Sequence, residues 1–316
     1  MVSYIIRRTL MSIPILIGIS IITFTVMHLA PGSPSSMLLA PDITPETRMQ
    51  FEERYGLNDP IPVQYVKWVS AMVQGDMGYS LIRLGTPVSE LIWNRLPNTL
   101  ILMGASTILA VIVAIPLGIL SARRPYTLTD YTVTFGSFVG VATPNFWVGL
   151  LLIMFFAVKF DIFPSGGIQT LNEPFSILDR LHHLFLPAIV LATSDMASLT
   201  RYSRSSMLEV IRQDYIRTAR AKGFKENTVI YKHGLRNGLI PIITIFGLML
   251  PSFFAGSVVV ERIFAWPGIG DLLITSVFQR DYPVIMGITM ISSALVVFGN
   301  LFADIAYAIF DPRIEY

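Results

Sequence analysis

Cysteine is absent from this sequence of 316 residues, and charged side chains are scarce. Without cysteine the chain has no disulfide, no thiolate metal ligand and no cysteine nucleophile. Only 14% of the residues are Asp, Glu, Lys or Arg, whereas a soluble globular domain has about 25%. The mean hydropathy is +0.61, and 53% of the residues are hydrophobic. The composition therefore predicts an integral membrane protein.

The sequence motifs of common enzyme classes are also missing. A phosphate-binding loop needs a Gly-Lys pair, and no glycine in this chain is followed by lysine. The chain also lacks the zinc motif H-E-x-x-H and the nucleophile elbow G-x-S-x-G. Of its four histidines only His182 and His183 are neighbours, and adjacent residues point to different sides of a helix or strand. A loop histidine pair is therefore favoured over a metal site, and we expect no enzyme activity.

Six long stretches of low charge divide the chain. Five contain no Asp, Glu, Lys or Arg, and one contains only Asp195; the stretches are residues 9–41, 96–122, 131–158, 181–200, 237–260 and 282–303. Because a helix rises about 1.5 Å per residue, about 20 apolar residues cross a hydrocarbon core of about 30 Å. We predict an all-α polytopic membrane protein with six transmembrane helices. The first apolar run is longer than a signal-peptide core, so we expect it to be retained.

The distribution of basic residues predicts the sidedness. Residues 201–236 have a net charge of +6, whereas residues 31–95 carry seven acidic and five basic side chains. Loops rich in Lys and Arg stay in the cytoplasm, so both termini and the loop 201–236 are predicted to be cytoplasmic. The expected organisation is an anchor helix at 1–30, an extracytoplasmic segment at 31–97 and a five-helix core at 98–316. The sidedness accounts for most of the overall charge of +2, which gives little support to nucleic-acid binding.

The predicted extracytoplasmic segment contains two helix-like stretches. Residues 43–60 read ITPETRMQFEERYGLNDP, in which Pro45 suits the first helical turn and Gly56 the helix end. Residues 62–78 carry apolar and aromatic side chains for packing at a membrane-facing surface. A cap over the helix bundle and a docking surface for a partner both remain open.

Asp195 is a carboxylate inside a predicted span. A charge at the bilayer centre costs roughly 2.5 to 3.5 kcal/mol on insertion scales, so it should face the bundle, a cavity or a partner charge. One interpretation makes Asp195 a pathway acid that meets a cationic group of the substrate. The other, which we favour from the sequence, makes it a satisfied residue near the cytoplasmic end of its helix.

A basic stretch at residues 214–241 reads DYIRTARAKGFKENTVIYKHGLRNGLIP. Nothing interrupts a helix between Gln213 and Lys222, and Gly223 is suited to end it. A second helix is predicted to start near Glu226. A slim basic helix with apolar side chains fits either a groove in another protein or a surface of anionic lipid. The residues alone leave both interpretations open.

Segments along essentially the whole chain resemble one known family. They are YIIRRTLMSIPILIGISIITF, HLAPGSP, YGLNDPIPVQYVKWV, GDMGYSL, RLPNTL, GVATPNFWVGLLL, RSSMLEVIRQDYIRTARAKG, VVVERIFAWPGIGDLL, RDYPV and FDPRIEY. In these segments the chain is similar to the permease subunits of ATP-binding-cassette importers, in the group for oligopeptides, dipeptides and nickel. Within that group it resembles the first of two homologous permeases.

This resemblance implies a type I importer permease fold and a mechanism of alternating access. It implies as partners a second homologous permease in a heterodimer, two cytoplasmic ATPase subunits, an extracytoplasmic substrate-binding protein and membrane lipid. ATP and magnesium are then expected in the ATPase subunits, with no cofactor, metal or catalytic residue in this one. The implied location is the inner or cell membrane of a bacterium or archaeon.

The same resemblance gives the basic stretch a role. In these importers a motif EAAxxxG forms the coupling helix that docks on the ATPase, and its last alanine and its glycine correspond here to Ala219 and Gly223. The residues expected to contact the ATPase are Asp214, Tyr215, Arg217, Thr218, Ala219, Ala221, Lys222, Gly223 and Phe224. Polar candidates for lining the path, each with helix packing as an alternative, are Asn145, Asp195, Ser252, Ser292 and Asn300.

Peptides are the expected substrates. Nickel, a metal chelate and glutathione are alternatives within the family, although the low histidine count disfavours a metal. Outside the family, an ion-coupled secondary transporter is the main alternative. Such transporters commonly have several ionisable groups within the membrane, whereas the six stretches here contain one carboxylate, Asp195, and no Lys or Arg.

Overall fold

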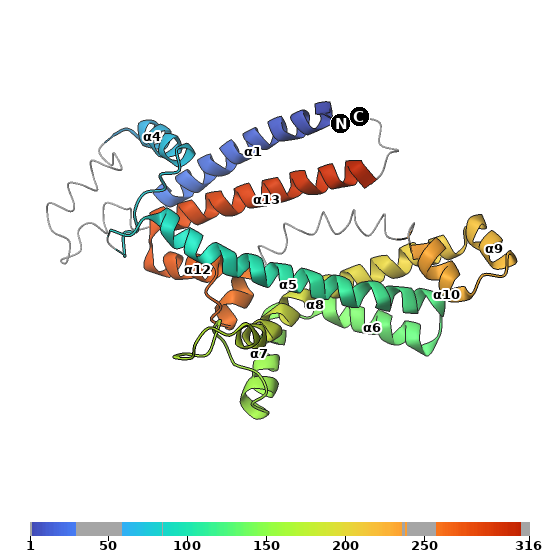
Figure 1. The fold of residues 1–316 in the computed structure, drawn as a ribbon. Coiled ribbons are helices and arrows are strands. Elements are labelled where there is room, and N and C mark those ends of the chain that lie inside the picture. Colours follow the sequence, from blue (N-terminus) through green and yellow to red (C-terminus); the bar gives the residue numbers. More distant parts are fainter. Residues whose placement is uncertain (1, 30–58, 84, 236–237, 239–256, 311–316) are drawn as a thin grey trace. The chain divides into compact units, whose positions relative to one another are not determined.

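A computed structural model of the chain describes residues 2–29, 59–83, 85–235, 238 and 257–310. Within these ranges the protein is helical and has no β-strand (Figure 1). The helices are α1 (Val2–Leu29), α4 (Ile61–Val73), α5 (Val88–Arg123), α6 (Leu128–Ala142), α7 (Asn145–Leu152), α8 (Ile177–Ile211), α9 (Asp214–Ala221), α10 (Glu226–Thr228), α12 (Ile269–Gln279) and α13 (Tyr282–Phe310). Two π-helices, η1 (Ile153–Lys159) and η2 (Val229–Gly234), continue α7 and α10. Residues 257–263 are also helical.

Four of the described helices are long and apolar enough to cross a membrane, namely α1, α5, α8 and α13. The pair formed by α6 with α7 and η1 adds a fifth crossing if its two parts make one span. The predicted span at 237–260 and the predicted helix at 43–60 lie mostly outside the described residues. The all-α polytopic fold is confirmed, and the chain is an integral membrane protein.

The third predicted span, residues 131–158, is not the straight helix that its lack of charge suggested. α6 ends at Ala142, and α7 leaves at an angle of 103°. Between them Thr143 and Pro144 are extended, with ψ angles of 124° and 134°. A residue before proline avoids the helical region, and proline has no N–H to continue the helix. The Thr143 hydroxyl donates to the Val139 carbonyl at 2.7 Å and satisfies part of the broken end.

One compact unit is made of Asn98–Asp271 and Phe298–Tyr316. In it α5 and α6 pack on α8 through glycines. A Cβ atom on Gly118 of α5 would lie within 2.9 Å of the Thr200 carbonyl oxygen of α8, and one on Gly140 of α6 would lie 2.9 Å from the Ala197 Cβ. Small residues allow such close approach between membrane helices.

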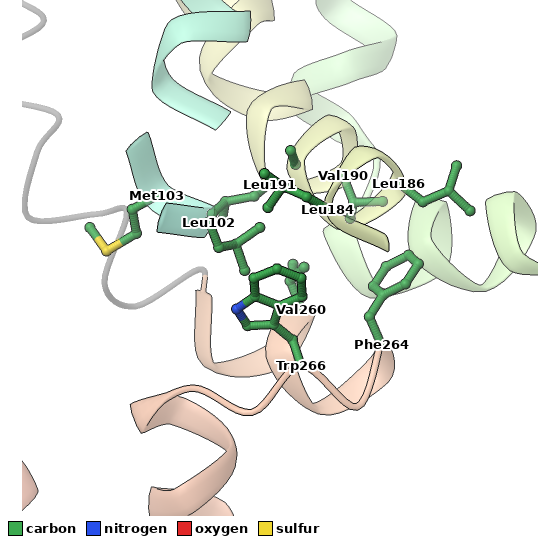
Figure 2. Close-up of a cluster of buried hydrophobic side chains, with 10 residues drawn as sticks. Leu102, Met103, Leu184, Leu186, Val190, Leu191, Val260, Phe264 and Trp266 are labelled. Atoms are coloured by element: carbon green, nitrogen blue, oxygen red, sulfur yellow. The ribbon is translucent and has the colours of Figure 1, made fainter. Parts of the chain in front are cut away.

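A cluster of buried apolar side chains joins α5, α8 and the segment after 257–263 in this unit (Figure 2). The rings of Phe264 and Trp266 point toward Val190 and leucines of α8. The Trp266 indole N–H donates to the Asn98 carbonyl at 3.0 Å, and the Asn98 amide donates to the Pro267 carbonyl at 2.8 Å. Because its polar edge is satisfied, Trp266 can be almost fully buried.

The other unit is made of Val2–Pro97 and Leu272–Val297. Its α1 and α4 pack through aromatic rings, with Phe24 of α1 within 5.4 Å of Tyr65 and 5.7 Å of Trp68 between ring centroids. Ser20 and Tyr65 share a hydrogen bond of 2.8 Å between their hydroxyl oxygens. The aromatic residues predicted for surface packing in 62–78 therefore pack on the first helix.

Candidate functional site

The segment predicted to dock on a partner begins where α8 ends. α8 continues to Ile211, eleven residues into the range 201–236 that was predicted as a loop. Nothing in residues 201–211 interrupts a helix, so the helix runs on beyond its apolar part. Gln213 then has extended backbone angles, and the short helix α9 starts at Asp214 (Figure 1). We name residues 213–224 the docking segment.

Two inward-facing residues anchor the docking segment. Ile216 is 1% exposed and Ala219 is also buried, three positions further along. Both pack with Val210 at the end of α8 and Val229 at the start of η2. Residues three apart lie on one face of a helix, so α9 has a buried face that fixes its position. Ile216 is one of the apolar side chains that the sequence suggested for contact with a partner or with lipid, and this expectation was wrong because Ile216 is buried in the protein. Its spacing from Ala219 was a signal for this inner face.

The end of α9 is closed by backbone hydrogen bonds around Gly223. Gly223 has a φ of +79°, a conformation that residues with a Cβ atom rarely adopt. Its N–H donates to the Arg220 carbonyl at 2.9 Å, and the Phe224 N–H donates to the Ala219 carbonyl at 3.4 Å. These two bonds are the Schellman motif, which satisfies free carbonyls at a helix end. The predicted helix end at Gly223 is confirmed.

An ion pair links α9 to the next helix. The Arg220 guanidinium donates to both carboxylate oxygens of Glu226, at 2.8 and 3.2 Å. These hydrogen bonds hold the pKa of Glu226 below its ordinary value. The ion pair therefore persists at neutral pH, and its contribution to stability is lost only as the pH falls through that lowered pKa.

The outer face of the docking segment is basic with two aromatic rings. Tyr215 is 41% exposed and Phe224 is 49% exposed, and Phe224 lies 5.6 Å from the His233 ring between centroids. Of the nine residues predicted to contact an ATPase, all but Ala219 are exposed; they are Asp214, Tyr215, Arg217, Thr218, Ala221, Lys222, Gly223 and Phe224. This arrangement presents a charged and aromatic surface on a helix that is held from behind.

A buried ion pair joins α6 to α8, the helix that leads into the docking segment. Asp130, at the start of α6, is 2% exposed. It accepts hydrogen bonds from Arg204 Nε at 2.6 Å and Nη2 at 2.8 Å, from the Tyr126 N–H at 2.9 Å and from the Ser121 hydroxyl. The sequence prediction missed this pair because Asp130 and Arg204 are far apart in the chain.

A second buried carboxylate organises the segment after 257–263. Glu261 accepts hydrogen bonds from the Thr99 hydroxyl at 2.8 Å and from the N–H groups of Gly270 and Asp271 at 2.7 and 3.1 Å. The last two are free donors at the start of α12, where a carboxylate is stabilising. A Cβ atom on Gly268 would overlap the Glu261 carboxylate. The motif ERIFAWPGIGD thus builds a capped turn.

Replacing Glu261 by alanine is expected to destabilise this turn strongly. Each buried donor left without a partner costs roughly 1 to 3 kcal/mol. Glu261→Gln should cost less, because its amide oxygen can still accept from Gly270 and Asp271. The measurement is the melting temperature of the purified protein in detergent, with Glu90→Ala on the exposed side of α5 as the control. Equal melting temperatures for Glu261→Ala and Glu90→Ala would contradict this assignment.

The adjacent histidines bind backbone carbonyls. His182 Nε2 lies 2.7 Å from the Ile162 carbonyl, and His183 Nδ1 lies 3.0 Å from the Gly166 carbonyl. Among the described residues no three side chains of His, Cys, Asp or Glu come together as a metal site. Both rings therefore hold the segment before α8 in place.

The five candidate path residues are distributed over the chain. Asn145 opens α7 and Asp195 lies in the middle of α8, and both are partly exposed. Asn300 is exposed on α13, and Ser292 is partly exposed on the part of α13 that belongs to the other unit. Ser252 lies outside the described residues. Asp195 is the charged member of this set, and it is considered again below.

Comparison with known proteins gives matches over the full length. The family model described as "Binding-protein-dependent transport system inner membrane component" matches residues 114–316, and the model for its N-terminal part matches residues 1–103. The oligopeptide transport system permease protein AppB of Bacillus subtilis is 66% identical, with 100% of both chains covered. The dipeptide permease DppB of Alkalihalophilus pseudofirmus is 39% identical with 100% of both chains covered, and DppB of Escherichia coli K12 is 36% identical with 100% of this chain and 99% of that one covered.

Proposed function

We propose that this chain carries peptides across the membrane. It belongs to the family of binding-protein-dependent transport system inner membrane components, and it is thus a permease subunit of an ATP-binding-cassette importer. The full-length relatives named for oligopeptide and dipeptide transport support this substrate class. The chain would form half of a path that opens alternately to each side of the inner or cell membrane. Nickel, metal chelates and glutathione are the competing substrates to test.

The proposed partners follow from the family. They are a second homologous permease, two ATPase subunits that hold ATP and magnesium, and an extracytoplasmic binding protein that delivers the peptide. This chain has no phosphate-binding loop of its own, so ATP hydrolysis must be transmitted to it by contact. To move a gate from 1:99 to 99:1, that contact must supply about 5.5 kcal/mol of preference between two states.

We assign this contact to the docking segment. The observation that supports it is the docking segment itself: its eight-residue helix α9 is fixed on the inner face by Ile216 and Ala219, and the segment exposes the rings of Tyr215 and Phe224. A helix that lay flat on lipid would be expected to turn its apolar side chains toward the membrane. Here the apolar side chains Ile216 and Ala219 face the protein, and the outward face is mainly polar and basic.

The test is purification of the complex from native membranes in mild detergent, with mass spectrometry of what accompanies the chain. We expect a P-loop ATPase and a second permease with the wild type. The double variant Tyr215→Ala/Phe224→Ala should lose the ATPase by about ten-fold or more, since aromatic residues commonly dominate binding energy at interfaces. The control is Tyr131→Ala/Phe135→Ala, which removes exposed aromatic residues of α6.

Two outcomes would contradict the assignment. If the ATPase stays bound to the docking-segment variant, the contact lies elsewhere. If the wild-type chain purifies alone and still transports in vesicles under an ion gradient, the chain works as a secondary transporter.

A further inference from the structure

One face of α8 is polar where the predicted span 181–200 passes into the continuation of the helix. Each of its residues lies three or four positions from another member of the set; they are Ser194, Asp195, Ser198, Arg201, Tyr202 and Ser205. Side chains at such intervals lie on the same side of a helix. We name these six residues the polar stripe of α8. All are at least partly exposed in the structure.

Most of the polar stripe points away from the helices that pack on α8, and Arg201, at its edge, lies over the Phe138 ring of α6. Ala192, Met196 and Leu199 contact alanines of α5, and Ser203 lies against Gly118 of the same helix. Thr193 and Ala197 lie against Gly140 of α6. With about 100° of rotation per residue, these contacts occupy two sides of α8 and leave the polar stripe on the remaining one.

Two charges on the polar stripe have no hydrogen bond or ion pair among the described residues. Asp195 makes no hydrogen bond or ion pair with any of them. The Nε atom of Arg201 is buried without an acceptor within the same ranges, and its guanidinium lies 5.5 Å from the centre of the Phe138 ring. By contrast, Arg204, one turn further on but on the α6 side, is fully engaged by Asp130.

A polar face of this kind does not suit lipid. An unpaired charge in the membrane is costly, and such residues usually line a cavity or a substrate path. Serine hydroxyls and a tyrosine add donors and acceptors that peptide groups can use. We propose that the polar stripe of α8 lines the translocation path and that Asp195 and Arg201 contact the two charged ends of a short peptide. This proposal rests on the proposed function, because it names the site where that substrate passes.

The spacing of the two charges fits short peptides. Arg201 follows Asp195 by six positions, which is about 9 Å along a helix axis and about 120° around it. An extended chain covers about 3.3 to 3.6 Å per residue, so a dipeptide or tripeptide places its ammonium and carboxylate groups at about this separation. Contacts at two single charges also leave the peptide side chains free, which suits a path that accepts many sequences.

The natural absence of cysteine allows a direct test of the path. Ser194→Cys, Ser198→Cys and Ser205→Cys each introduce a thiol into a chain that has none. In the assembled complex in membrane vesicles, a charged, membrane-impermeant thiol reagent should label all three, with a rate that a transported peptide lowers. The controls are Ile108→Cys, exposed on an apolar face of α5, and Ala192→Cys, buried against α5; neither should react.

Transport by charge variants completes the test. Asp195→Asn and Arg201→Gln should each lower peptide uptake by about ten-fold, on the scale of about 1.4 kcal/mol for one lost charged contact, while the ATPase still co-purifies. The control variants Asp161→Asn and Arg124→Gln change exposed charges elsewhere and should transport normally.

The outcomes separate the proposal from its premise. If the three thiols are unreactive but form disulfides with thiols engineered into the second permease, the polar stripe is a subunit interface and the proposal fails. Normal uptake by both charge variants would also overturn it. Loss of the ATPase from the wild-type complex would instead overturn the proposed function, and thiol labelling can be read independently of that result.

Discussion

Replacing Arg204 by alanine is expected to cost about 3 to 5 kcal/mol of stability, because it leaves a buried carboxylate without its partner. Asp130 is buried and depends on two hydrogen bonds from Arg204. These bonds tie the start of α6 to the part of α8 that leads into the docking segment. The melting temperature of the purified protein in detergent should fall by several degrees, and the yield from membranes should fall with it.

Two further variants show whether geometry or charge matters at this pair. Arg204→Lys keeps the charge but cannot donate two parallel bonds, so we expect an intermediate loss. Arg212→Ala removes an exposed arginine just after the end of the same helix and should change the melting temperature little. If Arg204→Ala and Arg212→Ala have the same melting temperature, the buried ion pair contributes nothing to the stability of the protein.

Replacing Ile216 by alanine is expected to uncouple ATP hydrolysis from transport. Ile216 is the larger of the two buried anchors of α9, and a buried isoleucine cut to alanine costs about 2 to 5 kcal/mol. An eight-residue helix has little stability of its own, so this loss should fall on the position of α9. We expect peptide-stimulated ATPase activity of the reconstituted complex to drop by about ten-fold or more, since each 1.4 kcal/mol is about a factor of ten.

The conservative variant Ile216→Val is the control. It should cost only about 0.5 to 1.5 kcal/mol and retain most of the coupling. The chain itself should still reach the membrane in both variants, because the affected cluster lies at the end of α8. Full stimulation in Ile216→Ala would show that the docking segment does not transmit the signal.

The helical fold was predictable because the bilayer imposes it. A long apolar run in a membrane has to satisfy its backbone internally, so charge-free stretches become helices. A count of charges cannot detect the bend between α6 and α7, but Pro144 marks it in the sequence as a possible kink. The extension of α8 to Ile211 was not predicted, because the charged residues after the apolar part were taken as a loop although the helix continues through them.

The docking segment was predictable in outline but not in its supports. Gly223 predicted the end of α9, because glycine is the residue that most easily adopts the positive φ needed at a helix end. The sequence does not say which carboxylates pair with Arg220 and Arg204, because several Asp and Glu residues lie at a suitable separation along the chain from each arginine. Which contacts form depends on how α6, α8 and η2 pack, and that packing is visible only in the structure.

Ala219 and Gly223 divide the work of the docking segment in a way that bears on how importers acquire new ATPases. One is buried and small, the other has a left-handed backbone, and neither needs to touch a partner through its side chain. Among the exposed side chains, Arg220 also holds the segment through its ion pair with Glu226. Under the proposed function, a permease can change its other exposed residues to match a different ATPase while the scaffold that presents them stays the same. Grafting the exposed residues of another permease onto this helix is then expected to change which ATPase binds.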